Sequence, residues 1–153
     1  MRALEHKIPP PVVAVLIATA MWGISSFEPA LPLAPALRIF LAGILAIAGV
    51  SFDALGLLAF RRSRTTINPM KPSKASALVT GGVYQVSRNP MYVGLVFLLA
   101  AWAVYLSMLW PFTGPVLFVF YMNRFQIGPE ERVLRGKFGE DYAAYAARVR
   151  RWL

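Results

Sequence analysis

A stretch of 20 residues without a charged side chain, Met91 to Trp110, constrains this chain more than any other feature. A helix of about 20 apolar residues, rising 1.5 Å per residue, crosses the roughly 30 Å hydrocarbon core of a bilayer. Hydrophobic residues make up 58% of the 153-residue chain and charged residues 15%, whereas soluble proteins average about 45–50% and about 25%. We therefore predict an all-α, polytopic integral membrane protein that forms a single domain.

Three further apolar runs accompany this stretch, and together they predict four transmembrane helices. The three runs lie at 12–27, 37–60 and 112–127. The predicted plan has four parts: two transmembrane helices within 12–60, a polar loop over 61–90, a transmembrane hairpin over 91–127 and an amphipathic tail over 128–153. Because further apolar runs follow the first, we expect no cleaved signal peptide.

The basic residues predict the orientation. If the N-terminus, the 61–90 loop and the C-terminal tail lie in the cytoplasm, every Lys and Arg except Arg38 is cytoplasmic. This arrangement follows the positive-inside bias of membrane proteins. We expect a bacterial or archaeal cytoplasmic membrane protein, in contact with membrane lipids, with both termini in the cytoplasm.

Charge and composition exclude several function classes. The net charge of +9 arises from basic residues that flank apolar runs, and no face interleaves basic and aromatic side chains, so we expect no nucleic-acid partner. The chain has no Cys and a single His, His6. We therefore expect neither a metal site nor a Ser-His-Asp triad.

Polar side chains gather where the polar loop meets the 91–110 run. Asn89-Pro90 is typical of a helix start, because Asn is a preferred N-cap and Pro is favoured at the first helical position. Such an end attracts anions, and Arg88 adds a guanidinium suited to a carboxylate or phosphate. Tyr92 lies beside them in the sequence. The alternative is that Arg88 reaches lipid headgroups and Asn89 is only a cap.

A second predicted helix start follows the last apolar run, at Gly128–Glu131. Carboxylates in a first turn are favoured by the helix dipole, and this effect alone explains Glu130 and Glu131. The functional alternative is that both face an ammonium, a sulfonium or ribose hydroxyls.

Two charged residues lie at membrane depth. Arg124, six residues before Glu130, is placed where an ionisable side chain usually faces a cavity or a partner. It either pairs with a glutamate or holds a substrate headgroup. Asp53, inside the second run, is a functional candidate by the same rule, or it bonds a Ser or Tyr of a neighbouring helix.

The tail has one apolar stripe at helical spacing, with Gly139 as a possible break between two shorter helices. Its members are Leu134, Phe138, Tyr142, Tyr145, Val149 and Trp152. This spacing predicts an amphipathic helix on the cytoplasmic membrane surface or packed over the spans.

In this order the motifs resemble the isoprenylcysteine carboxyl methyltransferase family, to which phospholipid methyltransferases are related. The resemblance covers about residues 60 to 153. It is carried by TGGVYQVSRNPMYVG at 80–94, the charge-free hairpin, Glu130-Glu131, and FGEDYAAY with RVRRW at 138–152. Asn89 stands where eukaryotic members have His, so a titrating role is not carried over to this position.

The resemblance implies a membrane enzyme that transfers a methyl group from S-adenosylmethionine at the cytoplasmic side. The residues that it implies for cofactor binding are Tyr84, Asn89, Pro90, Tyr92, Glu130, Glu131, Tyr142 and Tyr145. Arg88 and Arg124 are the catalytic candidates, because either would orient a lipid-like or prenylated acceptor. A carboxylate acceptor needs no base, whereas an amine must lose a proton, which the glutamate pair could accept.

Two rival functions stay open. A nicotinamide-dependent membrane reductase of the sterol reductase type has a similar C-terminal pattern, with more spans and more polar groups for phosphates. A small non-enzymatic membrane protein, such as a scaffold or transporter subunit, is the other. Transporters often carry inverted repeats and polar groups at mid-membrane, and here only Asp53 fits that description.

Overall fold

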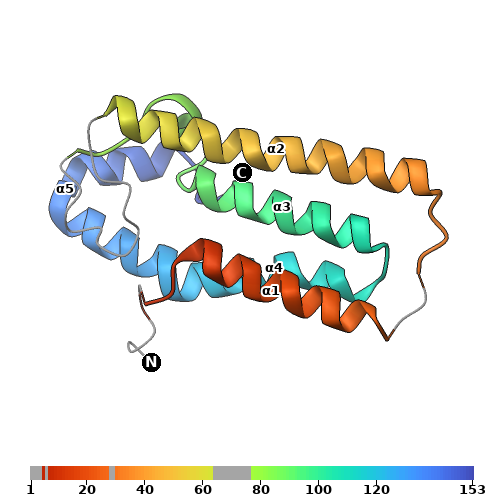
Figure 1. Ribbon diagram of the computed structural model, residues 1–153. Helices are drawn as coiled ribbons and strands as arrows, with labels where there is room; N and C mark the ends of the chain where they lie inside the picture. The colour runs from red at the N-terminus through yellow and green to blue at the C-terminus, as the bar shows by residue number, and fades with distance from the viewer. Residues whose placement is uncertain (1–4, 6, 28–29, 64–76) are drawn as a thin grey trace.

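The computed structural model describes residues 5, 7–27, 30–63 and 77–153, and every regular element within these ranges is helical (Figure 1). The predicted all-α class is therefore confirmed. His6 and much of the predicted 61–90 loop, residues 64–76, lie outside the described residues.

The helix α3 lies at the centre of the bundle and contacts α1, α2 and α4 (Figure 1). In chain order the elements are α1 (Pro10–Ser25), α2 (Pro35–Arg62), the 3₁₀ turn η3 (Gly82–Gln85), α3 (Pro90–Leu106), the 3₁₀ turn η4 (Trp110–Phe112), α4 (Thr113–Met122), the π-helical turn η5 (Asn123–Ile127) and α5 (Gly128–Arg148). The core between α1, α3, α4 and η5 contains Val13, Met21, Tyr92, Leu99, Phe118, Met122 and Ile127.

Proline fixes where three of these helices begin. Pro10, Pro35 and Pro90 each occupy the first turn of a helix, where the missing N–H costs nothing. The predicted start at Asn89-Pro90 is thus confirmed. Asn89 occupies the N-cap position, but its side chain makes no capping hydrogen bond and instead donates to the carbonyl oxygen of Arg151 at 2.9 Å.

The helices α2 and α3 approach each other closely at two glycines. A Cβ atom at Gly94 would lie 2.8 Å from the carbonyl oxygen of Gly49 and closer still to the carboxylate of Asp53. Asp53 therefore lies at the contact between the two helices, against the Gly94 backbone. This contact leaves no space for a larger residue at either glycine.

We expect Gly94→Ala to destabilise the protein by about 1–3 kcal/mol, because the added methyl must displace backbone atoms of α2. Thermal unfolding in detergent measures the effect. Gly43→Ala is the matched control: nothing lies within 4 Å of its Cβ position, and replacing a helical Gly by Ala is favourable there. Equal melting temperatures for the Gly94 variant and the natural protein would contradict the close packing.

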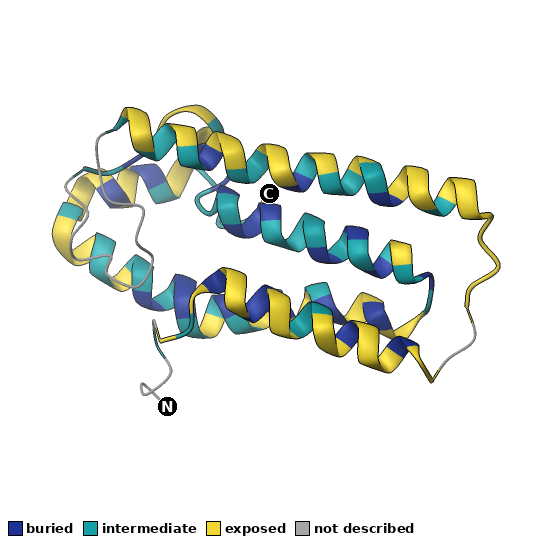
Figure 2. Cartoon of the chain, viewed as in Figure 1, coloured by how far each residue is buried: buried dark blue, intermediate teal, exposed yellow. Residues whose placement is uncertain are grey.

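Among the described residues, α2 is the one helix long and apolar enough to cross a membrane, with 28 residues. Much of its surface is exposed along its whole length (Figure 2). Ile47, for example, is 70% exposed. The helices α1 and α3 are apolar but shorter, with 16 and 17 residues. An apolar, exposed α2 supports membrane association, and the four-span topology stays a prediction.

The predicted helix start at Gly128 is confirmed, since α5 begins there with Pro129, Glu130 and Glu131 in its first turn. This start does not follow a break in the helix, however. The backbone of Met122 and Ile127 is helical, so α4, η5 and α5 follow one another without an interruption. Pro129 has no N–H to donate to the carbonyl oxygen of Phe125. Just before it the helix widens into a π turn, in which the Gly128 N–H donates to the carbonyl oxygen of Asn123. The expected hairpin therefore runs on into the tail helix.

The predicted break at Gly139 is confirmed. Gly139 has φ 47° and ψ −120° within α5, a left-handed conformation that is strained for any residue with a side chain. The bend turns the second half of α5 back toward the start of α3 (Figure 1).

Candidate functional site

Residues 149–152, near the C-terminal end of the sequence, lie along the start of α3; we call them the C-terminal strap. The Arg88 N–H donates to the carbonyl oxygen of Arg150 at 2.9 Å. The Ser87 hydroxyl and the Asn89 amide both donate to the carbonyl oxygen of Arg151, at 3.3 and 2.9 Å. The strap thus brings the charged end of the tail against the polar cluster that precedes α3.

Trp152 fixes the end of the strap. Its indole N–H donates to the Asn123 side-chain oxygen in the π turn at 3.1 Å, and its ring packs against the bundle core. The strap is therefore held at both sides, by the segment before α3 and by η5.

Glu131 is the centre of an ionic group. Its Oε1 accepts from Nε of Arg151 at 2.9 Å and lies 3.3 Å from Nη2 of Arg88. Its Oε2 accepts from Nη2 of Arg151 at 2.6 Å. The Arg88 side chain, 15% exposed, also donates to the Tyr142 oxygen at 3.4 Å. Within the described part of the chain, Nε of Arg88 is buried without a partner.

Glu130 points into the interior beside this group. Its Oε1 accepts from the Tyr92 hydroxyl at 2.7 Å and from the Gln126 amide at 3.0 Å. Burial raises the pKa of Glu130 to about 7, although hydrogen bonds from Tyr92 and Gln126 oppose the rise and the nearby charge of Glu131 adds to it. Near neutral pH, Glu130 therefore exists in both protonated and ionised forms, as a group that accepts or gives a proton must.

Three tyrosines connect the tail to the segment before α3. The Tyr145 hydroxyl donates to the carbonyl oxygen of Tyr84 at 2.7 Å, and the rings of Tyr142 and Tyr145 meet edge to face at 6.4 Å. Burial raises the pKa of all three hydroxyls, so they stay protonated hydrogen-bond donors at neutral pH. The ring of Tyr84 also packs against Phe60 of α2.

The structure brings most of the predicted site residues to one end of the bundle. Arg88, Asn89, Glu131 and Tyr142 share the strap and the ionic group, while Tyr92 meets Glu130 and Tyr84 meets Tyr145. Pro90 lies buried at the first position of α3.

Arg124 stands apart from this group. Its guanidinium lies 4.0 Å from the Glu5 carboxylate, its side chain is 53% exposed, and it packs over the ring of Phe125. The described residues provide no ion pair between Arg124 and either glutamate of the predicted pair.

Sequence reasoning missed three members of the site: Gln126, Ser87 and Arg151. Gln126 precedes Glu130 by four residues, the spacing of neighbours on one helix face. A continuous helix through this region would have predicted the contact. No local signal marks Ser87 or Arg151. Ser87 bonds a residue more than 60 positions away, and Arg151 pairs with Glu131 across the bend at Gly139.

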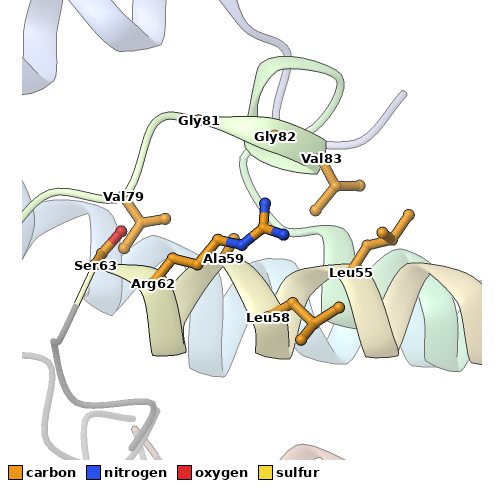
Figure 3. Close-up of a pocket in the computed structure, with 9 residues that line it drawn as sticks. All are labelled: Leu55, Leu58, Ala59, Arg62, Ser63, Val79, Gly81, Gly82 and Val83. Carbon is orange, nitrogen blue, oxygen red and sulfur yellow. The ribbon is translucent and has the colours of Figure 1, made fainter.

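A cavity of about 220 Å³ lies between the end of α2 and the segment before η3. Figure 3 shows the guanidinium of Arg62 extending along the cavity toward Val83 and Leu55. The remaining lining residues are Leu58, Ala59, Ser63, Val79, Gly81 and Gly82. The cavity is smaller than the roughly 300–1,000 Å³ of most ligand pockets, and its lining is apolar with one cation.

Comparison with known proteins agrees with the predicted resemblance. A family model described as phospholipid methyltransferase matches residues 37–141. An uncharacterized protein of Haemophilus influenzae is 41% identical over 63 residues, which is 41% of this chain and 100% of that relative. No solved structure matches the chain. Because the match covers more than half of the chain and includes both the start of α3 and the glutamate pair, the chain belongs to the phospholipid methyltransferase family.

Proposed function

We propose that this protein is an S-adenosylmethionine-dependent methyltransferase that methylates a lipid-like or prenylated amphipathic acceptor at the cytoplasmic face of the membrane. The observation that carries the proposal is the ionic group of Arg88, Glu131 and Tyr142. Arg88 and Glu131 lie within the family match, residues 37–141, and Tyr142 lies one position beyond it. They meet at the end of the bundle where α3 begins, beside Glu130.

The residues at this end of the bundle fit the proposed cofactor. S-adenosylmethionine carries an ammonium, a carboxylate, ribose hydroxyls and a sulfonium. Glu131 already binds cationic groups, and Glu130 is a partly buried hydrogen-bond acceptor. The cationic groups and hydroxyls of the cofactor thus have complementary side chains here. Arg88 has a buried Nε without a described partner, which suits a carboxylate or phosphate oxygen of the acceptor.

The bound cofactor would supply an electrophilic methyl group on sulfur for in-line displacement. The protein must then align the acceptor, exclude water and balance charge. Glu130 and Glu131, with Asn89 and Tyr92, hold the cofactor. Arg88 or Arg124 orients the acceptor. For an amine acceptor, Glu130 is the proton acceptor, because its pKa of about 7 lets it ionise at neutral pH.

The proposal includes four membrane spans with both termini in the cytoplasm. The start of α1, the end of α2, the start of α3 and α5 all lie at one end of the molecule (Figure 1). The basic residues Arg61 and Arg62 end α2 at this side. This grouping agrees with the positive-inside bias.

The cavity beside Arg62 suits part of an amphipathic acceptor. Leu55 and Leu58 are 52% and 45% exposed on the outer side of α2, which the proposed topology turns toward lipid. An apolar chain would lie against these leucines, with an anionic headgroup at Arg62. The segment from Gly82 to Arg88 then connects the cavity with the ionic group.

The test is cofactor binding by calorimetry on the full chain in detergent. We expect S-adenosylhomocysteine, the stable product form, to bind the natural protein and to bind an Asn89→Ala, Glu131→Ala double variant at least about 30-fold more weakly, since a charge-assisted contact is lost. Unchanged affinity in the double variant would refute the assignment. Protection against heating by a reduced nicotinamide instead of S-adenosylhomocysteine would favour the reductase alternative.

A further inference from the structure

Two cations share the Glu131 carboxylate, and they are held differently. Arg151 makes two hydrogen bonds to it, at 2.9 and 2.6 Å, whereas Arg88 lies at 3.3 Å. The Arg151 side chain is 39% exposed and that of Arg88 is 15% exposed. Arg88 also donates to Tyr142. Arg151 is thus the more strongly hydrogen-bonded cation, but it is also the more exposed one, so water can take up its guanidinium if it leaves Glu131.

The backbone of Arg151 stays fixed when its side chain moves. Its carbonyl oxygen accepts from both Ser87 and Asn89, and the next residue, Trp152, is bonded to Asn123. A rotation of the Arg151 side chain alone would free Oε2 of Glu131, while Oε1 would stay 3.3 Å from Nη2 of Arg88. Rotations of this kind take picoseconds to nanoseconds in exposed side chains.

Glu131 and Arg151 together present one carboxylate and one guanidinium side by side, with each satisfying the other. This is the complement of an α-amino acid, which carries an ammonium and a carboxylate on one carbon. A guanidinium binds a carboxylate with two parallel hydrogen bonds, and a carboxylate also binds an ammonium. The pair can thus exchange its internal contact for two contacts with one ligand.

We infer that Glu131 and Arg151 form the recognition pair for the amino-acid end of S-adenosylmethionine. Glu131 exchanges the Arg151 guanidinium for the ligand's ammonium, and Arg151 turns to the ligand's carboxylate. This inference rests on the proposed methyltransferase function and extends it to a residue beyond 37–141, the part of the chain that the family match covers.

Two ligands that differ only at the amino-acid end test the inference. S-adenosylhomocysteine has this end, whereas 5′-methylthioadenosine keeps the adenosine and the thioether but lacks it. Calorimetry on the detergent-solubilised full chain gives both affinities. We expect Arg151→Ala to weaken the binding of S-adenosylhomocysteine about 10- to 100-fold. The affinity for 5′-methylthioadenosine should change less than about twofold. Arg151→Lys keeps the charge but loses the two parallel N–H donors. Its affinity for S-adenosylhomocysteine should lie between those of Arg151→Ala and the natural protein.

Arg150→Ala is the matched control. It removes the same charge one residue away, from an exposed side chain, and keeps the carbonyl that accepts from Arg88. It should leave both affinities unchanged. Equal weakening of both ligands by Arg151→Ala, or unchanged binding of S-adenosylhomocysteine, would overturn the inference while leaving the proposed function standing. Binding of neither ligand to the natural protein would overturn both.

Discussion

Replacing Glu131 with Gln is expected to reduce both S-adenosylhomocysteine binding and methyl transfer about 30- to 140-fold. The substitution keeps the size of the side chain but removes the charge that Arg88 and Arg151 share. It also replaces one acceptor oxygen with an amide NH₂ group, which cannot accept a hydrogen bond from the guanidinium N–H donors. Loss of a charge-assisted contact of this kind costs about 2–3 kcal/mol, and each 1.4 kcal/mol is a factor of ten.

Binding is measured by calorimetry, and methyl transfer by the incorporation of labelled methyl groups into lipid extracts of the host membrane. Glu140→Gln is the control for charge, because Glu140 is exposed on the same helix. It should leave both measurements within about twofold of the natural protein. If Glu131→Gln binds S-adenosylhomocysteine within about threefold of the natural protein, Glu131 has no role in holding the cofactor.

The elements that the sequence predicted correctly are those with local causes. Asn89-Pro90 starts α3 because Pro restricts its own φ and lacks an N–H. Gly139 bends α5 because its positive φ is easily reached only by Gly. The apolar runs became helices that pack around α3. Each of these outcomes depends on a few neighbouring residues and needs no knowledge of distant contacts.

The continuous passage from α4 into α5 was not predictable from local signals. Gly128-Pro129 has the composition of a helix start, and the same residues also fit a π turn. The extra residue in such a turn rotates everything after it by about 100°, given 3.6 residues per turn. Straight-helix spacing therefore cannot tell whether Arg124 and Glu130 lie on the same helix face. In the structure, Arg124 faces Glu5.

The ionic group was predicted in part. Two of its members, Arg88 and Glu131, stood out because charges beside apolar runs are conspicuous in a sequence. Arg151 did not, because it is one of several arginines in a basic tail. Its role depends on the path of the strap after Arg148, where Val149 turns to extended backbone. Long-range packing decides that path, and no local pattern reports it.

The stability of the protein is expected to fall as pH rises from about 5 to about 8, and Glu130→Gln should remove much of this fall. Burial raises the pKa of Glu130 from 4.5 to about 7. Between these two values the unfolded chain has released the proton that the folded protein still holds, so rising pH favours unfolding. The contribution is complete below pH 4.5 and is lost as pH passes through about 7. Its size, about 3 kcal/mol, follows from the difference between the two pKa values.

The comparison of the two proteins isolates Glu130. Gln keeps the acceptor oxygen for the Tyr92 hydroxyl and the Gln126 amide and cannot ionise. His6, the only histidine, is present in both proteins, so its effect cancels in the difference. Thermal midpoints in detergent at pH 5, 6, 7 and 8 should diverge progressively, with Glu130→Gln the more stable protein at pH 8 and similar at pH 5. Parallel midpoints across this range would mean that Glu130 is ionised throughout, and it would then no longer qualify as the proton acceptor for an amine.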